Sequence, residues 1–205
     1  MTDALSFKDK KVIVFDLDGT IVDLTVDWMN LKKVLSDRFS EVHNQASCLF
    51  DSISKCLNAI VEKEEEEELE YNFNIIQKHE LDEVKNSKPI KESVFFIKNM
   101  KMFGVQEATK LAICSLNSRE CIKETLKLAG VLDKFDFIVG RDDVTKWKPD
   151  PEGLLKIMDH FKATKKNLVY FGDLPKDIQT GKNAGIDAYY INEIIDAVRN
   201  LQKNG

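Results

Sequence analysis

The sequence predicts an α/β fold, with a parallel sheet covered by helices on both faces and a small α-helical segment inserted after the first strand. Two observations predict this fold. From Thr109 to the end of the chain, short apolar runs alternate with helix-like segments, as in parallel strands joined by helices. Before that point, roughly 90 residues after the first apolar run show only helical periodicity, which suits a small helical bundle.

The first predicted strand is the apolar run from Val12 to Leu17, and it ends in two acids. Asp16 and Asp18 stand two residues apart, so an extended backbone would point both carboxylates to one side. Two neighbouring carboxylates are costly to bury unless a cation neutralises them, and Mg²⁺ prefers oxygen ligands. Gly19 allows a sharp turn and a close approach to a ligand. The alternative interpretation is a strand followed by an acidic turn.

Amphipathic helices are predicted next, because apolar residues recur at helical spacing. The predicted helices cover 28–40, 49–61 and 69–81, and a further helix starts near Pro89. We therefore predict a core domain formed by 1–23 and 89–205, and a helical domain formed by 24–88, here called the helical insertion.

Each later apolar run is followed by polar residues. The predicted strands and the residues that follow them are 111–114 before Ser115 and Asn117, 135–139 before Lys148, and 167–171 before Asp173 and Asp177. A last strand is predicted over 188–191. The carboxyl ends of parallel strands share one crevice, where ligands of open α/β sheets bind. These side chains are therefore expected to converge on Asp16 and Asp18.

In this order, the four motifs resemble those of the haloacid dehalogenase-like (HAD) superfamily of phosphatases and phosphomutases. The first motif is Asp16-Leu17-Asp18-Gly19-Thr20, and the others are Ser115, Lys148, and Gly172-Asp173 with Asp177. The resemblance covers essentially the whole chain and implies a Rossmann-like core with a C1-type cap, as in subfamily I. Two positions depart from the usual pattern: Leu116 separates Ser115 from Asn117, and Leu174 stands where a small residue is common.

The resemblance also implies the chemistry. Asp16 would attack phosphorus and form an aspartyl-phosphate, while Asp18 would act first as an acid and then as a base. A Mg²⁺ cofactor would be bound by Asp16, by the backbone carbonyl of Asp18 and by Asp173. The residues implied in substrate binding are Gly19, Thr20, Ser115, Asn117 and Lys148, and Ser115 and Lys148 would act in catalysis.

Asp177 has two open interpretations. It would hold Lys148 or a metal-bound water, or, because Pro175 marks a helix start, it would interact with the dipole at the helix N-terminus.

In HAD proteins a C1-type cap opens and closes over the site, excluding bulk water and contacting the substrate. The resemblance therefore implies that substrate specificity depends on the helical insertion. Its candidate specificity residues are Trp28, Lys32 and Lys33. The alternative for Trp28 is a core residue, and for the lysines a solvated helix surface.

Composition limits the function classes. The chain has 205 residues, of which 43% are hydrophobic and 32% charged, as in ordinary globular proteins. It lacks the basic stripe of a nucleic-acid-binding protein and any apolar run of the roughly 20 residues that span a membrane. The cysteines at positions 48, 56, 114 and 121 lack metal-site spacing, so we expect reduced thiols. With no signal peptide, the expected location is cytoplasmic. The oligomeric state is not predicted.

The formal charge of −5 is concentrated in one run. Glu62 to Glu70 contains seven glutamates and one lysine, a local charge of −6, which leaves the remainder near +1. We expect a solvated helix face there, with a site for a divalent cation or a basic partner as the alternative.

These features favour a Mg²⁺-dependent phosphatase that hydrolyses a small phosphate monoester, resembling phosphoglycolate phosphatases; a sugar phosphate is an equally open substrate. A phosphomutase would use the same residues and return the phosphate to the sugar. A haloacid dehalogenase is disfavoured by Asp18, because those relatives lack this second carboxylate. A non-catalytic binding or regulatory protein is the alternative of another class, although it needs no nucleophile and acid together.

Overall fold

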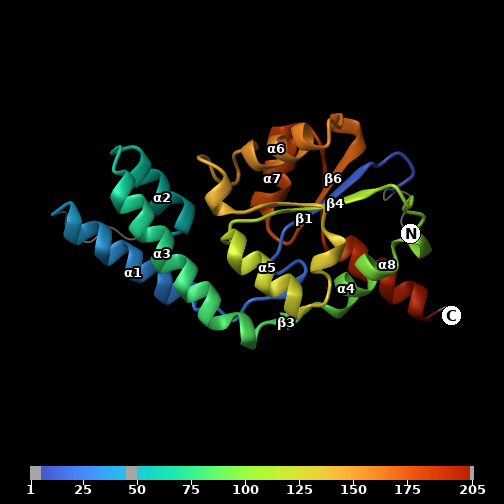
Figure 1. The fold of residues 1–205 in the computed structure, drawn as a ribbon, viewed down its shortest axis with the longest axis horizontal. Coiled ribbons are helices and arrows are strands. Elements are labelled where there is room, and N and C mark those ends of the chain that lie inside the picture. The colour runs from blue at the N-terminus through green and yellow to red at the C-terminus, as the bar shows by residue number, and fades with distance from the viewer. Residues whose placement is uncertain (1–5, 45–49, 204–205) are drawn as a thin grey trace.

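Five parallel strands form the central sheet. They are β1 (Val12–Phe15), β4 (Lys110–Cys114), β5 (Phe137–Val139), β6 (Leu168–Gly172) and β7 (Asp187–Tyr190). The computed structural model describes residues 6–44 and 50–203. The strand order is β5-β4-β1-β6-β7, and every neighbouring pair is parallel. Figure 1 shows helices on either side of this sheet, so the predicted α/β, Rossmann-like fold is confirmed.

Successive residues of β1 contribute to opposite faces of the sheet, as strand geometry requires. Val12 and Val14 belong to one buried apolar cluster, whereas Ile13 and Phe15 belong to the other. The run is apolar throughout because helices cover both faces and neither meets water.

The covering helices are α4 (Lys91–Lys98), α5 (Arg119–Leu128), α6 (Glu152–His160), α7 (Pro175–Ala184) and α8 (Asn192–Lys203). Helices α6 and α7 pack on one face, and α4, α5 and α8 pack on the other. Local signals set their ends: the Ser118 side chain caps α5 by accepting from the Cys121 amide, Pro175 begins α7, and Gly185 ends α7 with a φ of 72°.

Three helices between β1 and α4 lie together beside the sheet (Figure 1). They are α1 (Trp28–Val42), α2 (Ile53–Val61) and α3 (Glu66–Glu83). The chain leaves and re-enters the sheet region through two short antiparallel strands, β2 (Val22–Asp23) and β3 (Lys88–Pro89). These strands hold the two connections side by side.

Among the described residues, no helix combines the length and apolar character that a bilayer span requires.

Short 3₁₀ helices lie between these elements, at η1 (Val84–Asn86), η2 (Met100–Phe103), η3 (Leu132–Lys134), η4 (Arg141–Asp143) and η5 (Lys165–Asn167).

Some predicted boundaries of strands and helices differ from the observed ones. The first strand ends at Phe15 rather than Leu17, because the Leu17 carbonyl accepts from the amides that follow it and folds the chain into a turn. The start of the helix predicted over 49–61 falls partly outside the described residues, and α2 begins at Ile53.

The acidic run is only partly the solvated face that its composition predicts. Its second half forms the first turns of α3, where carboxylates favour the positive end of the helix dipole. Glu68 is an exception, because it accepts two hydrogen bonds from Arg38 on α1 and one from the Asn72 side chain. The run therefore also joins two helices of the insertion.

Of the cysteines, Cys114 and Cys121 are buried free thiols, and Cys48 lies outside the described residues.

Candidate active site

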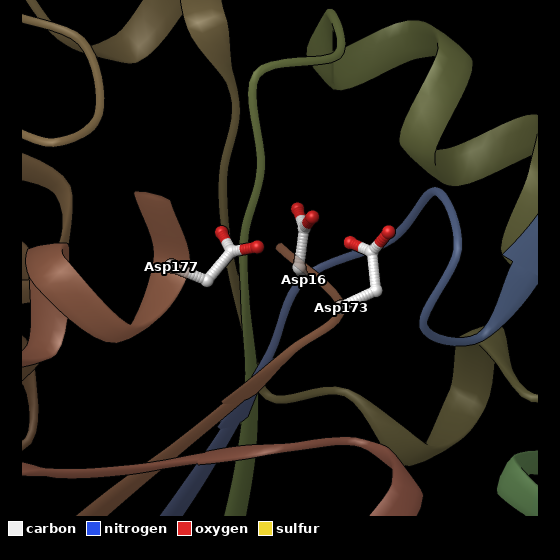
Figure 2. Close-up of side chains that lie close together, drawn as sticks. All are labelled: Asp16, Asp173 and Asp177. Carbon is white, nitrogen blue, oxygen red and sulfur yellow. The ribbon is translucent and has the colours of Figure 1, made fainter. Parts of the chain in front are cut away.

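Three carboxylates meet at the carboxyl edge of the sheet. Asp16 follows β1, Asp173 follows β6, and Asp177 lies in the first turn of α7. Figure 2 shows Asp16 between the other two, with all three carboxylates turned toward the same region. One oxygen from each lies within 4.8 Å of the others. Residues separated by more than 150 positions thus form one acidic cluster.

Lys148 neutralises part of this cluster. Its Nζ lies 2.9 Å from Asp16 Oδ1 and 2.8 Å from Asp177 Oδ1, and all three side chains are buried. The hydroxyl of Tyr170, a residue of β6, donates to Asp177 Oδ1 at 2.9 Å. Asp177 Oδ2 accepts from the Leu174 amide, so both of its oxygens are occupied. Both interpretations of Asp177 agree with this geometry: it holds Lys148, and it bonds the N-terminal turn of α7.

Burial and charge oppose each other in these groups. Burial raises the pKa of Asp16 above its usual value, even though the charge of Lys148 lowers it. For Asp177 burial acts in the same direction, but Lys148 prevails and the pKa is lowered. The pKa of Lys148 is raised, because the two carboxylates outweigh its burial. Lys148 is therefore a fixed positive charge beside Asp16.

Asp18 faces different partners from Asp16. Its Oδ1 accepts from the Leu24 amide at 2.8 Å, and its Oδ2 accepts from Trp28 Nε1 at 3.1 Å. The expected extended geometry does not persist to Asp18, because the chain turns and Asp18 forms an isolated bridge with Val22. Burial raises the pKa of Asp18 to about 6. A carboxyl of this kind can hold a proton near neutral pH.

Two glycines permit the close packing of these loops. Gly19 has a φ of 72°, and a Cβ there would collide with the Asp173 carboxylate. A Cβ on Gly172 would collide with Asp177. The motif glycines thus bring backbone and carboxylates together. The other proposed binding residue of this loop, Thr20, is fully buried, and its carbonyl accepts from Ser93 Oγ at 2.7 Å.

A divalent cation fits this arrangement. Asp173 Oδ1 is buried and has no hydrogen-bond partner among the described residues. Burial together with the charge of Asp16 raises the pKa of Asp173 to about 6. A cation bound between Asp16 and Asp173 would give this oxygen a partner and would lower the raised pKa. The donors are oxygens, as Mg²⁺ prefers. Asp177 is the less suitable ligand because Lys148, Tyr170 and Leu174 already occupy its oxygens.

The second motif follows β4 and is tied to the helical insertion. Ser115 Oγ donates to Asn117 Oδ1 at 2.9 Å, and Asn117 Nδ2 donates to Glu80 Oε1 on α3 at 3.1 Å. Glu80 also forms an ion pair with Arg141, with Arg141 NH1 2.8 Å from Oε1. The sequence analysis missed Glu80 and Arg141. A signal for Glu80 was present, because it follows Phe73 and Ile76 at helical spacing on the apolar face of α3.

A cavity of about 320 Å³ lies between the sheet edge and the helical insertion. The core contributes Asp16, Asp18, Ser115, Asn117 and Asp173, and the insertion contributes Trp28, Lys32, Ile53, Leu57 and Glu80. Lys33 is not among the lining residues. Its side chain is 71% exposed and pairs with Asp37 on α1, because it stands one position along the helix from Lys32 and faces away from the cavity.

Known proteins resemble this chain over most of its length. A phosphoglycolate phosphatase from Aquifex aeolicus is 30% identical over 182 residues, which cover 85% of this chain and 81% of that protein. A pyrophosphatase PpaX from Listeria welshimeri is 27% identical over 177 residues, covering 84% and 78%. A shorter match, 43% identical over 81 residues, links 40% of this chain to 38% of the pyrophosphatase PpaX of Halalkalibacterium halodurans.

Solved structures share the fold. A hydrolase from Pseudomonas syringae superposes with a TM-score of 0.62 at 17% identity, covering 92% of this chain and 90% of its own. A HAD-superfamily hydrolase of subfamily IA from Geobacter sulfurreducens has a TM-score of 0.57 at 18% identity, covering 93% and 97%. The sequence model for "haloacid dehalogenase-like hydrolase" matches residues 13–191. With this match and the Aquifex relative, the chain belongs to the haloacid dehalogenase-like hydrolase family.

Proposed function

We propose that the protein is a Mg²⁺-dependent phosphatase that hydrolyses a small phosphate monoester through a phosphoryl group carried on Asp16. The observation that supports this most strongly is the buried Asp16 carboxylate, which is bonded to Lys148 and lines the cavity beside Asp18. The phosphatase names of the relatives agree with it.

Two half-reactions use the two carboxylates. In the first, Asp16 attacks phosphorus, the bond from phosphorus to the ester oxygen breaks, and Asp18 gives that oxygen its proton. In the second, Asp18 takes a proton from water, the water oxygen bonds to phosphorus, and the bond to Asp16 breaks to release phosphate. The raised pKa of Asp18, about 6, suits a group that must both give and accept a proton.

Lys148 and Ser115 act on the phosphoryl oxygens. Lys148 already lies 2.9 Å from Asp16 and remains charged, so it attracts the incoming phosphate to the nucleophile. Ser115 lines the same cavity and offers a hydroxyl. Asp177 holds Lys148 in place through their 2.8 Å contact.

The proposed cofactor is Mg²⁺, held by the carboxylates of Asp16 and Asp173 and by the backbone carbonyl of Asp18. When bound, the ion would offset the repulsion between the carboxylate nucleophile and the anionic phosphate. The supporting observation is the buried Oδ1 of Asp173, which meets no hydrogen-bond partner within the described part of the chain.

Residues 24–88 are proposed to form a cap over this site. Their helices form one wall of the cavity, and the antiparallel β2 and β3 strands hold both connections together. The cavity volume suits a small ligand. Trp28 and Lys32 are the proposed contacts to the leaving group, since both line the cavity.

Inorganic pyrophosphate is a second candidate substrate. Lys176, in the first turn of α7, lines the cavity together with Lys32, so two cations are available to a second anionic group. The pyrophosphatase relatives point to the same substrate.

A substrate panel tests the proposal. Purified protein is assayed with Mg²⁺ on phosphoglycolate, sugar phosphates, pyrophosphate and an activated aryl phosphate, and both products are identified. Release of inorganic phosphate supports a phosphatase, and transfer of phosphate back to the sugar would indicate a phosphomutase. No turnover of any phosphate compound would sink the proposal.

A further inference from the structure

A buried polar cluster connects α3 to the loops that follow β4 and β5. Glu80 has no exposed surface and Arg141 is only 2% exposed. Their carboxylate and guanidinium are joined by contacts of 2.8 and 3.2 Å. Neither residue takes part in the half-reactions above, yet both line the cavity.

The cluster continues to the second motif. Glu80 Oε2 accepts from the Ser118 amide at 3.1 Å, and Glu80 Oε1 accepts from Asn117 Nδ2 at the same distance. Asn117 Oδ1 accepts from Ser115 Oγ at 2.9 Å, and the Asn117 amide donates back to that hydroxyl oxygen at 3.3 Å. An unbroken hydrogen-bonded path therefore runs from Arg141 through Glu80 and Asn117 to Ser115.

Glu80 fixes the order of donors and acceptors along this hydrogen-bonded path. An ionised carboxylate only accepts hydrogen bonds, so the NH₂ group of Asn117 must face it. The carbonyl of the same amide must then face Ser115, where it accepts from the hydroxyl. Without Glu80, nothing else in the path would require this orientation, and the Ser115 side chain would lose a bond that fixes its rotamer.

Stability alone is a weak reason for such a pair. Two buried charges must be desolvated, and a well-packed apolar pair of similar volume often serves equally well. A role in fixing the geometry of the site explains why a charge from the insertion is buried against these loops.

We propose that Glu80 is a positioning residue that holds the Ser115 side chain in one rotamer through Asn117, so that phosphate binding depends on how α3 packs. The single hydroxyl proton, donated to Asn117 Oδ1 in this structure, turns to a phosphoryl oxygen when phosphate binds. The inference rests on the proposed function in one respect, namely that Ser115 contacts the phosphoryl group. Glu80 itself touches no reacting atom.

The test compares Glu80→Gln with a matched control on the same helix. Glu68 also accepts from an arginine and from an asparagine side chain, Arg38 and Asn72, but it lies in a different part of the insertion and does not line the cavity. Glu80→Gln is expected to raise KM and the Kd of inorganic phosphate about tenfold, with a smaller change in kcat. Glu68→Gln is expected to lower the melting temperature without changing KM or Kd.

A double-mutant cycle tests the path through Asn117. If Glu80 acts through Asn117, then Glu80→Gln/Asn117→Ala will bind phosphate as weakly as Asn117→Ala alone, because the second change removes nothing further. If the double variant instead lost phosphate affinity by the product of the two single-variant losses, Glu80 would act by another route and the inference would be overturned. A glutamine can still turn its carbonyl oxygen toward Asn117, so Glu80→Met/Arg141→Met, which removes both buried charges and the acceptor, is measured as well and replaces Glu80→Gln should that variant fail to fold.

The readouts separate this inference from the proposed function. Calorimetric titration with inorganic phosphate needs no turnover, so an inactive wild type that binds phosphate would sink the proposed function while still testing Glu80. A Glu80→Met/Arg141→Met protein with wild-type KM and Kd would overturn the inference alone. A wild type that binds no phosphate would overturn both.

Discussion

The carboxyl edge of the sheet and the helical insertion differ in how most of their charged side chains are placed, with Glu80 as the buried exception on the insertion. At the sheet edge, Asp16, Lys148 and Asp177 are buried and bonded to one another. On the insertion, the pairs Lys33–Asp37 and Lys55–Asp51 have side chains that are more than 60% exposed. Exposed pairs contribute little to stability, whereas buried charges are costly to desolvate but stay fixed in position.

This difference suggests how the two regions divide the work. The sheet edge holds the groups that the proposed chemistry needs, on loops that glycines and buried hydrogen bonds constrain. The insertion reaches the cavity with side chains that include Trp28, Lys32 and Glu80, and most of its other charged residues face solvent. Changes at the edge should therefore affect every substrate, and changes on the insertion should affect substrates unequally.

The largest effect is expected for Asp16→Asn at the sheet edge. We predict a loss of at least about a thousandfold in kcat on every substrate, because an amide cannot attack phosphorus. The fold should survive, since the change removes a buried carboxylate whose pKa is already raised. Kinetics and circular dichroism check this, with Asp37→Asn as the surface control. Near-normal turnover, free of contaminating phosphatase, would show that Asp16 is not the nucleophile.

Metal removal should act on all substrates in the same way. Chelation by EDTA is expected to abolish turnover and added Mg²⁺ to restore it, because Asp16 and Asp173 supply an oxygen site. Asp173→Asn should raise the Mg²⁺ concentration needed for half-maximal activity. Full activity after exhaustive dialysis against chelator would contradict the proposed cofactor.

Trp28 lies where the two regions meet, and Trp28→Phe tests its bond to Asp18. A smaller aromatic ring replaces the indole and the Nε1–H donor is lost, so kcat/KM should fall about three- to tenfold. An activated aryl phosphate should lose less, because its leaving group needs little protonation. Equal losses on alkyl and aryl phosphates would mean that the bond does not serve the proton transfer.

Neighbouring lysines give a matched pair on the insertion itself. Lys32 lines the cavity and Lys33 does not. Lys32→Ala should change the ratios of kcat/KM among substrates by roughly two- to tenfold, and Lys33→Ala should leave them unchanged. Kinetics on three phosphate compounds, one of them pyrophosphate, would decide this. The same response from both variants would remove Lys32 from the specificity residues.

A smaller effect concerns pH and the metal-free protein. Burial raises the pKa of Asp173 to about 6 from a usual value near 4. The native state then holds its proton more tightly than the unfolded chain, so this group destabilises the metal-free protein progressively from about pH 4 to pH 6. Mg²⁺ should therefore raise the melting temperature more at pH 7.5 than at pH 5. Equal shifts at both pH values in scanning calorimetry would argue against Asp173 as a ligand.

The sequence predicted the sheet because its signals are local. Apolar runs mark strands that both faces bury, and the polar residues after each run indicate where the edge lies. Glu80 and Arg141 could not be paired in this way, since 61 residues separate them and only the packing of α3 brings them together. The sequence also did not predict that the side chains of Asp16 and Asp18 face different partners, because this depends on the turn at Gly19 and on Trp28.

Acid quenching of the first turnover tests the covalent role of Asp16 most directly. Wild-type protein is mixed rapidly with substrate and Mg²⁺, quenched, digested and analysed by mass spectrometry. We expect one phosphoryl group on the peptide that contains Asp16, located on that residue and absent from Asp16→Asn. A phosphoryl group on another residue, such as Asp18 or Asp173, would contradict the assignment of Asp16 as the nucleophile.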